Sequence, residues 1–151
     1  MKFNSKTAEI YISTGLPVEQ ALARTTHLCV AAHQDDIEIM AAQPILACFH
    51  QADKAFTGVV VTDGRGSPRD GFYKNISDET MRRVRFEEQR KAAMIGEYAA
   101  QVLLDYPSKV VKDPAQTALV EDLMTLLRAT KPKIVYTHNL ADKHDTHVAV
   151  S

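Results

Sequence analysis

The chain has 151 residues, of which 45% are hydrophobic and 25% are charged, and its formal net charge is −1. This length suits one domain with one core, and the near-neutral charge argues against a nucleic-acid-binding surface. The first 17 residues lack the apolar centre of a signal peptide, and no apolar run approaches the roughly 20 residues of a membrane span. Both cysteines fall in apolar segments. We therefore expect a cytoplasmic protein whose cysteines are reduced.

Apolar runs alternate with helical patterns along the whole chain. Pro44 lies inside one helical pattern, where we expect a kink or a late start, and Asp78 is a candidate N-cap for the next. The loop at 63–73 contains three glycines and a proline and is predicted to be irregular. We expect strands at 27–32, 55–62, 101–106 and 133–137, and helices at 17–24, 37–51, 79–98 and 116–130.

This alternation predicts an α/β fold with a mostly parallel sheet and right-handed crossovers. Ligands of such sheets bind at the carboxyl ends of the strands. Residues that directly follow the strands are therefore the first candidates for a functional site.

A histidine and two aspartates occupy the turn after the first predicted strand. His33 and Asp36 are three residues apart and can converge on one point, and an imidazole with a carboxylate suits zinc or another divalent metal. Asp35 points elsewhere and is free to act as a base. In the alternative interpretation, an aspartate of this turn caps the following helix and His33 is a histidine at the end of a strand.

Three histidines lie within ten residues after the last predicted strand. His144 and His147 share a face if a helix begins there, and His138 at the strand end is a candidate supporting residue. The alternative is a polar loop in which Asp142 or Asp145 acts as a cap. Because both clusters follow strands of one parallel sheet, together they favour a metal site.

The order of these motifs resembles a known enzyme family. Residues 32–38, Ala-His-Gln-Asp-Asp-Ile-Glu, resemble the Ala-His-Pro-Asp-Asp-Glu signature of the PIG-L/LmbE-like zinc-dependent N-acetylglucosaminyl deacetylases, and residues 144–147 resemble the later His-Pro-Asp-His motif of that family. Arg85 and Glu88 resemble its Arg-x-x-Glu helix, and residues 62–66 resemble its glycine-containing loop. The resemblance extends from about residue 27 onward.

The resemblance implies a Rossmann-like three-layer α/β/α fold and a Zn²⁺-dependent enzyme, with another divalent metal as an alternative. It implies removal of an N-acetyl group from an N-acetylglucosamine-type sugar conjugate, which releases acetate and a free amine. It assigns the zinc ligands as His33, Asp36 and His147. It makes Asp35 the general base and His144 the electrophilic group beside the substrate carbonyl. The substrate contacts that it implies are Arg85, Asp63 and Arg65.

The chain departs from the family pattern in several places. Gln34 replaces the signature proline, Ile37 is inserted before Glu38, and Thr146 stands where the family has an aspartate that supports the metal site. Asp145 and Asp142 are the candidates to replace that aspartate. Members of the family continue beyond the position of Ser151. We therefore expect 1–151 to be a single domain that is apparently truncated at its C-terminus, the N-terminal portion of the usual domain, with an exposed apolar face that favours a homo-oligomer.

Two other functions compete with sugar deacetylation. One is a metal-dependent amidohydrolase that acts on a small N-acylated molecule other than a sugar, and the other is a non-catalytic α/β binding domain. A nucleotide-binding domain is disfavoured because no Gly-x-Gly-x-x-Gly pattern follows the strand at 27–32.

Overall fold

The computed structural model describes residues 1–151 and contains one five-stranded sheet with the order β1-β4-β3-β2-β5. Strands β2 to β5 are mutually parallel, and β1 pairs antiparallel with β4 at one edge. The predicted α/β fold with a mostly parallel sheet is therefore confirmed. The strands are β1 (Glu9–Tyr11), β2 (His27–Ala31), β3 (Phe56–Thr62), β4 (Ala100–Tyr106) and β5 (Ile134–Tyr136).

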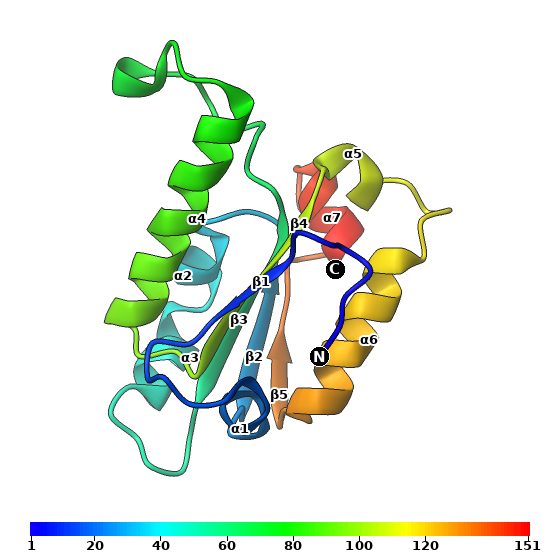
Figure 1. Cartoon of the computed structure of the whole chain (residues 1–151). Coiled ribbons are helices and arrows are strands. Elements are labelled where there is room, and N and C mark those ends of the chain that lie inside the picture. Colours follow the sequence, from blue (N-terminus) through cyan, green and yellow to red (C-terminus); the bar gives the residue numbers. More distant parts are fainter.

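Helices cover both faces of the sheet (Figure 1). One face carries α2 (Asp36–Met40), α3 (Ala42–Cys48) and α4 (Asp78–Ile95), and the other carries α5 (Ser108–Val111), α6 (Ala118–Thr130) and α7 (Asp145–Val150). The remaining helical elements are α1 (Val18–Ala23) and the 3₁₀ turn η1 (Gly71–Tyr73). None of the helices combines the length and apolar character that a membrane crossing would need.

Two hydrophobic clusters form the core, one on each face of the sheet. Cys29 and Ala31 of β2 belong to the cluster that includes Phe86 of α4, whereas Leu28 and Val30 belong to the cluster that includes Leu126 of α6. Neighbouring residues of a strand point to opposite faces, so β2 is apolar along its whole length. The central strands β3 and β4 are buried at every position, as expected for parallel strands that are covered on both sides.

Several local predictions need correction. The helix expected at 37–51 is two helices that meet at Ala41, and Pro44 lies in the first turn of α3, where the missing N–H costs no hydrogen bond. Ser77 rather than Asp78 caps α4, because its hydroxyl accepts the Thr80 N–H at 3.1 Å. Asp78 pairs instead with Arg69 at 2.7 Å.

The sequence patterns also missed three short elements, β1, η1 and α5, and misplaced the end of a helix. The polar segment that holds β1 becomes a strand because it pairs with β4, and the helix α5 has four residues. Helix α4 ends at Ile95 rather than at Tyr98, since the backbone turns at Gly96 and Glu97. These differences leave the order of the parallel strands unchanged.

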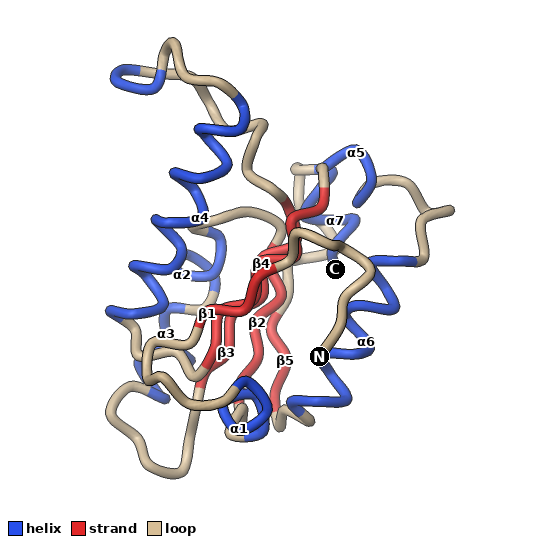
Figure 2. Tube along the Cα trace, viewed as in Figure 1, coloured by secondary structure: helices blue, strands red, loops and turns tan.

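The chain segments that follow β2 and β5 leave the sheet at the same end. The two strands are parallel neighbours with Cys29 opposite Tyr136, so their carboxyl ends meet at one edge. Figure 2 shows the loop and helix α7 that follow β5 at this end of the sheet. The fold therefore brings the two histidine-containing clusters together, as the sequence predicted.

Candidate metal centre

A tight turn after β2 sets the direction of the first cluster. Asp35 has a left-handed backbone (φ 87°) immediately before α2, a conformation that non-glycine residues rarely adopt. Asp36 folds back on the turn, and its Oδ2 accepts the His33 N–H at 2.7 Å. Gln89 of α4 holds the turn from outside, since its Oε1 accepts the Asp35 N–H at 3.1 Å.

Three side chains from the two clusters meet at one point. The Nδ1 atom of His33 lies 3.2 Å from Asp36 Oδ2 and 3.2 Å from His147 Nε2, and the last two atoms are 3.4 Å apart. Tetrahedral ligands at about 2.0–2.1 Å from a zinc ion are separated by about 3.3 Å. The donor set and its spacing therefore fit a zinc ion with three protein ligands.

The surroundings favour an ionised Asp36. Burial by itself raises the pKa of this carboxyl, but hydrogen bonds from the side chain and backbone of His33, together with the charges of His147 and His33, lower the pKa below its usual value. An ionised carboxylate is the form that binds a metal.

Two further histidines surround the triangle. The ligand atoms of His33, His144 and His147 lie within 4.8 Å of one another, and so do those of Asp36, His138 and His147. His144 caps α7, where its Nδ1 accepts the Thr146 N–H at 3.3 Å. The ring of the exposed His144 lies edge-on beside the His33 ring, at a centroid distance of 4.8 Å.

Two residues outside the predicted ligand set also touch the triangle, and the sequence offered both only as candidate supporting residues. His138 has only 6% of its side chain exposed, and its Nε2 lies 3.5 Å from Asp36 Oδ2. Burial lowers the pKa of His138 and favours its neutral form. Asp142 contacts His147, with 3.0 Å between Oδ2 and Nδ1. A usable signal for His138 was its place directly after a strand, the same place that His33 occupies after β2.

Asp35 lies outside the triangle although it is adjacent to Asp36. Its side chain is 62% exposed and pairs with Arg85 Nη2 of α4 at 2.9 Å. Arg85 also donates to Glu88 at 2.6 Å. Asp35 and Arg85 border two polar hollows of about 290 Å³ and 150 Å³, which also share Glu88. The turn thus separates the two carboxylates, one toward the histidines and one toward solvent.

The other predicted substrate contacts lie in a separate ion-pair network at the end of β3. Arg65 Nη1 donates to the buried Asp63 at 2.8 Å, and Arg65 Nη2 donates to Glu79 at 2.8 Å. The same Nη1 lies 3.7 Å from Asp105. None of these contacts involves a residue of the triangle, so the structure does not bring Asp63 and Arg65 into direct contact with the candidate metal ligands.

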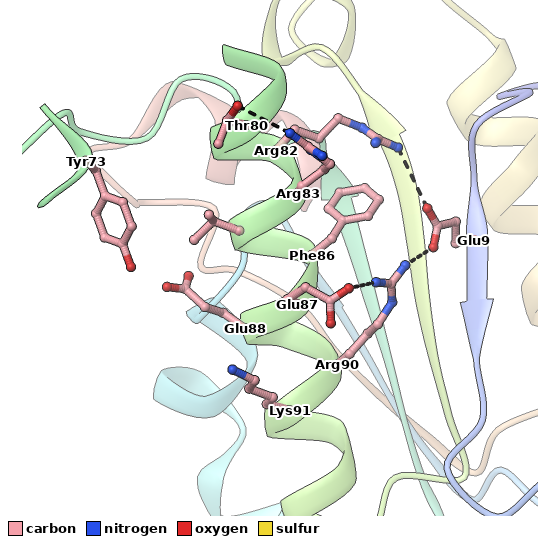
Figure 3. Close-up of a pocket in the computed structure, with 11 residues that line it drawn as sticks. Glu9, Tyr73, Thr80, Arg82, Arg83, Phe86, Glu87, Glu88, Arg90 and Lys91 are labelled. Carbon is pink, nitrogen blue, oxygen red and sulfur yellow. Dashed lines mark hydrogen bonds and ion pairs between the residues drawn. The ribbon is translucent and has the colours of Figure 1, made fainter. Parts of the chain in front are cut away.

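A hollow larger than the two beside Asp35 lies elsewhere, along the outer face of α4 (Figure 3). It measures about 720 Å³ and is lined mainly by charged side chains. Figure 3 shows Arg90 between Glu87 and Glu9, which ties α4 to β1. None of His33, Asp36 and His147 lines this hollow. The hollow is therefore separate from the candidate metal site, although it is large.

Residues 28–151 match the family model described as PIG-L, GlcNAc-PI de-N-acetylase. The chain belongs to the PIG-L family. The resemblance drawn from the sequence motifs is thereby confirmed, and the match includes both histidine clusters. Members of the PIG-L family are typically metal-dependent and deacetylating enzymes, and this member has candidate metal-binding histidine and aspartate residues. None of the curated proteins matches the chain.

Two solved structures share the fold of this PIG-L family member. The conserved protein TT1542 from Thermus thermophilus has a TM-score of 0.64 and 21% identity, over 83% of this chain and 52% of its own. GalB, the 4-carboxy-2-hydroxymuconate hydratase from Pseudomonas putida KT2440, has a TM-score of 0.62 and 20% identity, with the same coverage of 83% and 52%. The chain thus spans about half the length of these two proteins.

Proposed function

We propose that this chain carries the metal-binding part of a hydrolase that removes an N-acetyl group from a small molecule. The observation that carries the proposal is the triangle of His33 Nδ1, Asp36 Oδ2 and His147 Nε2, with sides of 3.2 to 3.4 Å. Three protein ligands leave a fourth position free, which is the pattern of catalytic rather than structural zinc sites. Membership of the PIG-L family supports the same conclusion.

Zn²⁺ is the metal that we assign to His33, Asp36 and His147, with another divalent ion as the alternative. When bound, the metal would polarise the acyl oxygen and lower the pKa of a water molecule towards about 7. Nitrogen and carboxylate donors at this spacing suit zinc better than calcium or magnesium, which prefer sites made of oxygen ligands alone.

Asp35 and His144 supply the proton chemistry in this proposal. The exposed Asp35 carboxylate takes a proton from the attacking water and passes it to the leaving nitrogen. His144 has its Nδ1 occupied by the Thr146 N–H, so an Nε2–H is available to donate to the oxygen that gains charge. The water oxygen first forms a C–O bond to the acyl carbon, and the amide C–N bond then breaks as the nitrogen receives the proton held by Asp35. The products are a carboxylate, acetate in the simplest case, and a free amine.

The substrate in this proposal is an N-acetylglucosamine-type sugar conjugate. The polar hollows beside Asp35 offer charged and amide groups that suit a hydroxylated molecule. Arg85 is a candidate substrate contact there, and Asp63 and Arg65 remain candidates at the border of the site. The alternatives are an N-acylated substrate other than a sugar and a binding domain without catalysis.

The proposal also covers the domain organisation, the oligomeric state and the location of the protein. We infer that residues 1–151 form a single domain of the Rossmann-like three-layer class, equivalent to the N-terminal portion of the family's domain. The exposed apolar side chains of β5, Ile134 and Val135, are 45% and 48% exposed and support a homo-oligomeric or otherwise covered form. A cytoplasmic location fits the two free cysteines.

The test combines metal content with product release. The chain is loaded with Zn²⁺ and assayed for acetate and free amine against an N-acetylglucosamine conjugate and against N-acetyl amino acids. We expect about one zinc per chain and release of both products from the sugar conjugate. Asp35→Asn should keep the zinc and lose at least about 100-fold in rate. The matched control is Asp145→Asn, because Asp145 is also an exposed carboxylate but belongs neither to the candidate metal-binding groups nor to the lining of the hollows beside Asp35.

The outcomes separate the candidate functions. Faster turnover of the N-acetyl amino acids would favour an amidohydrolase with a different substrate. Zinc binding with no turnover of any substrate would favour the binding domain. A folded chain that takes up neither zinc nor another divalent metal ion would rule out the proposal.

A further inference from the structure

His147 is held from two sides by residues outside the proposed ligand set. Asp142 contacts one edge of its ring, and His138 packs against one face of it. Both belong to the loop between β5 and α7, which has little regular structure of its own. A ligand at the start of a short helix needs such support if it is to keep one orientation before the metal arrives.

The contact with Asp142 fixes which nitrogen of His147 is free. Asp142 Oδ2 lies 3.0 Å from Nδ1 of His147, and as a carboxylate oxygen it accepts a hydrogen bond from an N–H at this position. The other oxygen, Oδ1, accepts the His144 N–H at 2.8 Å, so the carboxylate itself cannot swing away. With the proton on Nδ1, the lone pair of Nε2 faces His33 and Asp36.

The ring of His138 stacks against the ring of His147. The His138 and His147 rings stack with centroids 4.0 Å apart and an angle of 9° between their planes. His138 Nε2 accepts the Ala32 N–H at 2.8 Å, and this hydrogen bond holds the His138 ring against the residue that follows β2. This hydrogen bond uses the lone pair that His138 Nε2 would otherwise offer to a metal. His138 is therefore placed to support His147 rather than to bind the metal itself.

We infer that Asp142 and His138 are positioning residues that hold His147 in its ligating orientation, an inference that rests on the metal site of the proposed function. In this chain Thr146 occupies the position where the family motif has an aspartate, and its side chain is buried. Asp142, five residues before His147, supplies the carboxylate that a ligating histidine usually has behind it. The support thus comes from the loop rather than from the motif itself.

The first test is the affinity for Zn²⁺ alone, measured by competition with a chelator on the full chain. We expect Asp142→Asn to weaken zinc binding by about 10- to 100-fold. The matched control, Asp145→Asn, removes an exposed carboxylate three residues away and should leave the affinity unchanged. A second readout is the ¹⁵N NMR spectrum of the zinc-free chain, in which His147 should shift toward the Nε2–H tautomer in Asp142→Asn only.

His138 is tested with two substitutions that separate its contacts. His138→Phe keeps a ring against His147 and should retain stoichiometric zinc, whereas His138→Gln keeps a polar side chain for the Ala32 N–H but loses the stacked ring and should bind zinc more weakly. Circular dichroism verifies that both variants fold. If His138→Phe lost zinc as completely as His147→Ala, His138 would be a ligand and its supporting role would be wrong.

The experiment also separates this inference from the proposed function. Equal zinc affinities for Asp142→Asn and Asp145→Asn, alongside tight binding by the unmodified chain, would overturn the inference and leave the metal site intact. The absence of zinc binding by the unmodified chain would overturn both.

Discussion

The Nδ1 atom of His33 lies 3.2 Å from the Nε2 atom of His147, although the two residues are 114 positions apart in the sequence. They are brought together because β2 and β5 are parallel neighbours, so the segments after them leave from the same edge of the sheet. Asp36 completes the triangle from the same turn as His33. One metal ion should therefore depend on residues from both ends of the chain.

Removing either histidine should abolish metal binding. We expect His33→Ala and His147→Ala each to reduce bound zinc from about one equivalent to none, because two remaining ligands hold the ion too weakly. Elemental analysis of the purified variants measures this. His50→Ala is the control, since His50 pairs with Glu97 at 3.0 Å and has no contact with the triangle. Retention of zinc in either variant of the triangle would contradict a single shared site.

A side chain at Gly58 should destabilise the centre of the sheet. An added Cβ there would lie 2.5 Å from Gln101 Oε1 and 2.8 Å from Ile37 Cδ1, and both of these residues are fully buried. We expect Gly58→Ala to lower the free energy of unfolding by about 1–3 kcal/mol, as measured by urea denaturation. A Cβ added at Gly66 would have no atom within 4 Å, so Gly66→Ala should change the free energy of unfolding by less than about 0.5 kcal/mol. Equal effects at both positions would contradict the predicted clash.

The ion pair between Arg82 and Asp105 should contribute to stability. Asp105 has a side chain that is only 2% exposed and a left-handed backbone, and it accepts two hydrogen bonds from Arg82, at 2.7 and 2.8 Å. Arg82→Ala would remove both hydrogen bonds and leave the buried carboxylate with only the more distant Arg65, 3.7 Å away, so we expect a loss of about 3 kcal/mol in the free energy of unfolding. The neighbouring Arg83 is exposed, and Arg83→Ala should cost less than about 0.5 kcal/mol. A small loss for Arg82→Ala would show that water replaces the pair.

Alkaline pH should destabilise the fold through Cys29. Burial of its thiol, together with the charges of Glu38 and Asp36, raises the pKa of Cys29 from 9.0 to about 12. The unfolded thiol ionises first, so the stabilisation is complete below about pH 9 and is lost as the pH rises toward 12, by up to about 1.4 kcal/mol per pH unit. Denaturation at pH 8 to 10 measures this slope, and Cys29→Ala should flatten it. An unchanged slope in the variant would assign the effect to other groups.

Local sequence patterns predicted the strands β2 to β5, the long helices α4 and α6 and the two clusters at one edge of the sheet. They could do so because apolar runs of strand length and helical periodicity are local properties, and the carboxyl ends of parallel strands share an edge. His33 and Asp36 were candidate ligands because they lie three residues apart on one turn, whereas the choice of His147 over His144 as the third ligand came from the family resemblance. The family resemblance carried by these motifs was also a property of the sequence alone.

Only the tertiary structure decided the rest. Strand β1 exists because β4 offers it hydrogen bonds across the sheet, and no local pattern encodes that partner. The pairing of Asp35 with Arg85 and the support of His147 by Asp142 and His138 likewise depend on distances between segments. Such contacts are set by how the loops after β2 and β5 pack, and packing is a property of the folded chain as a whole.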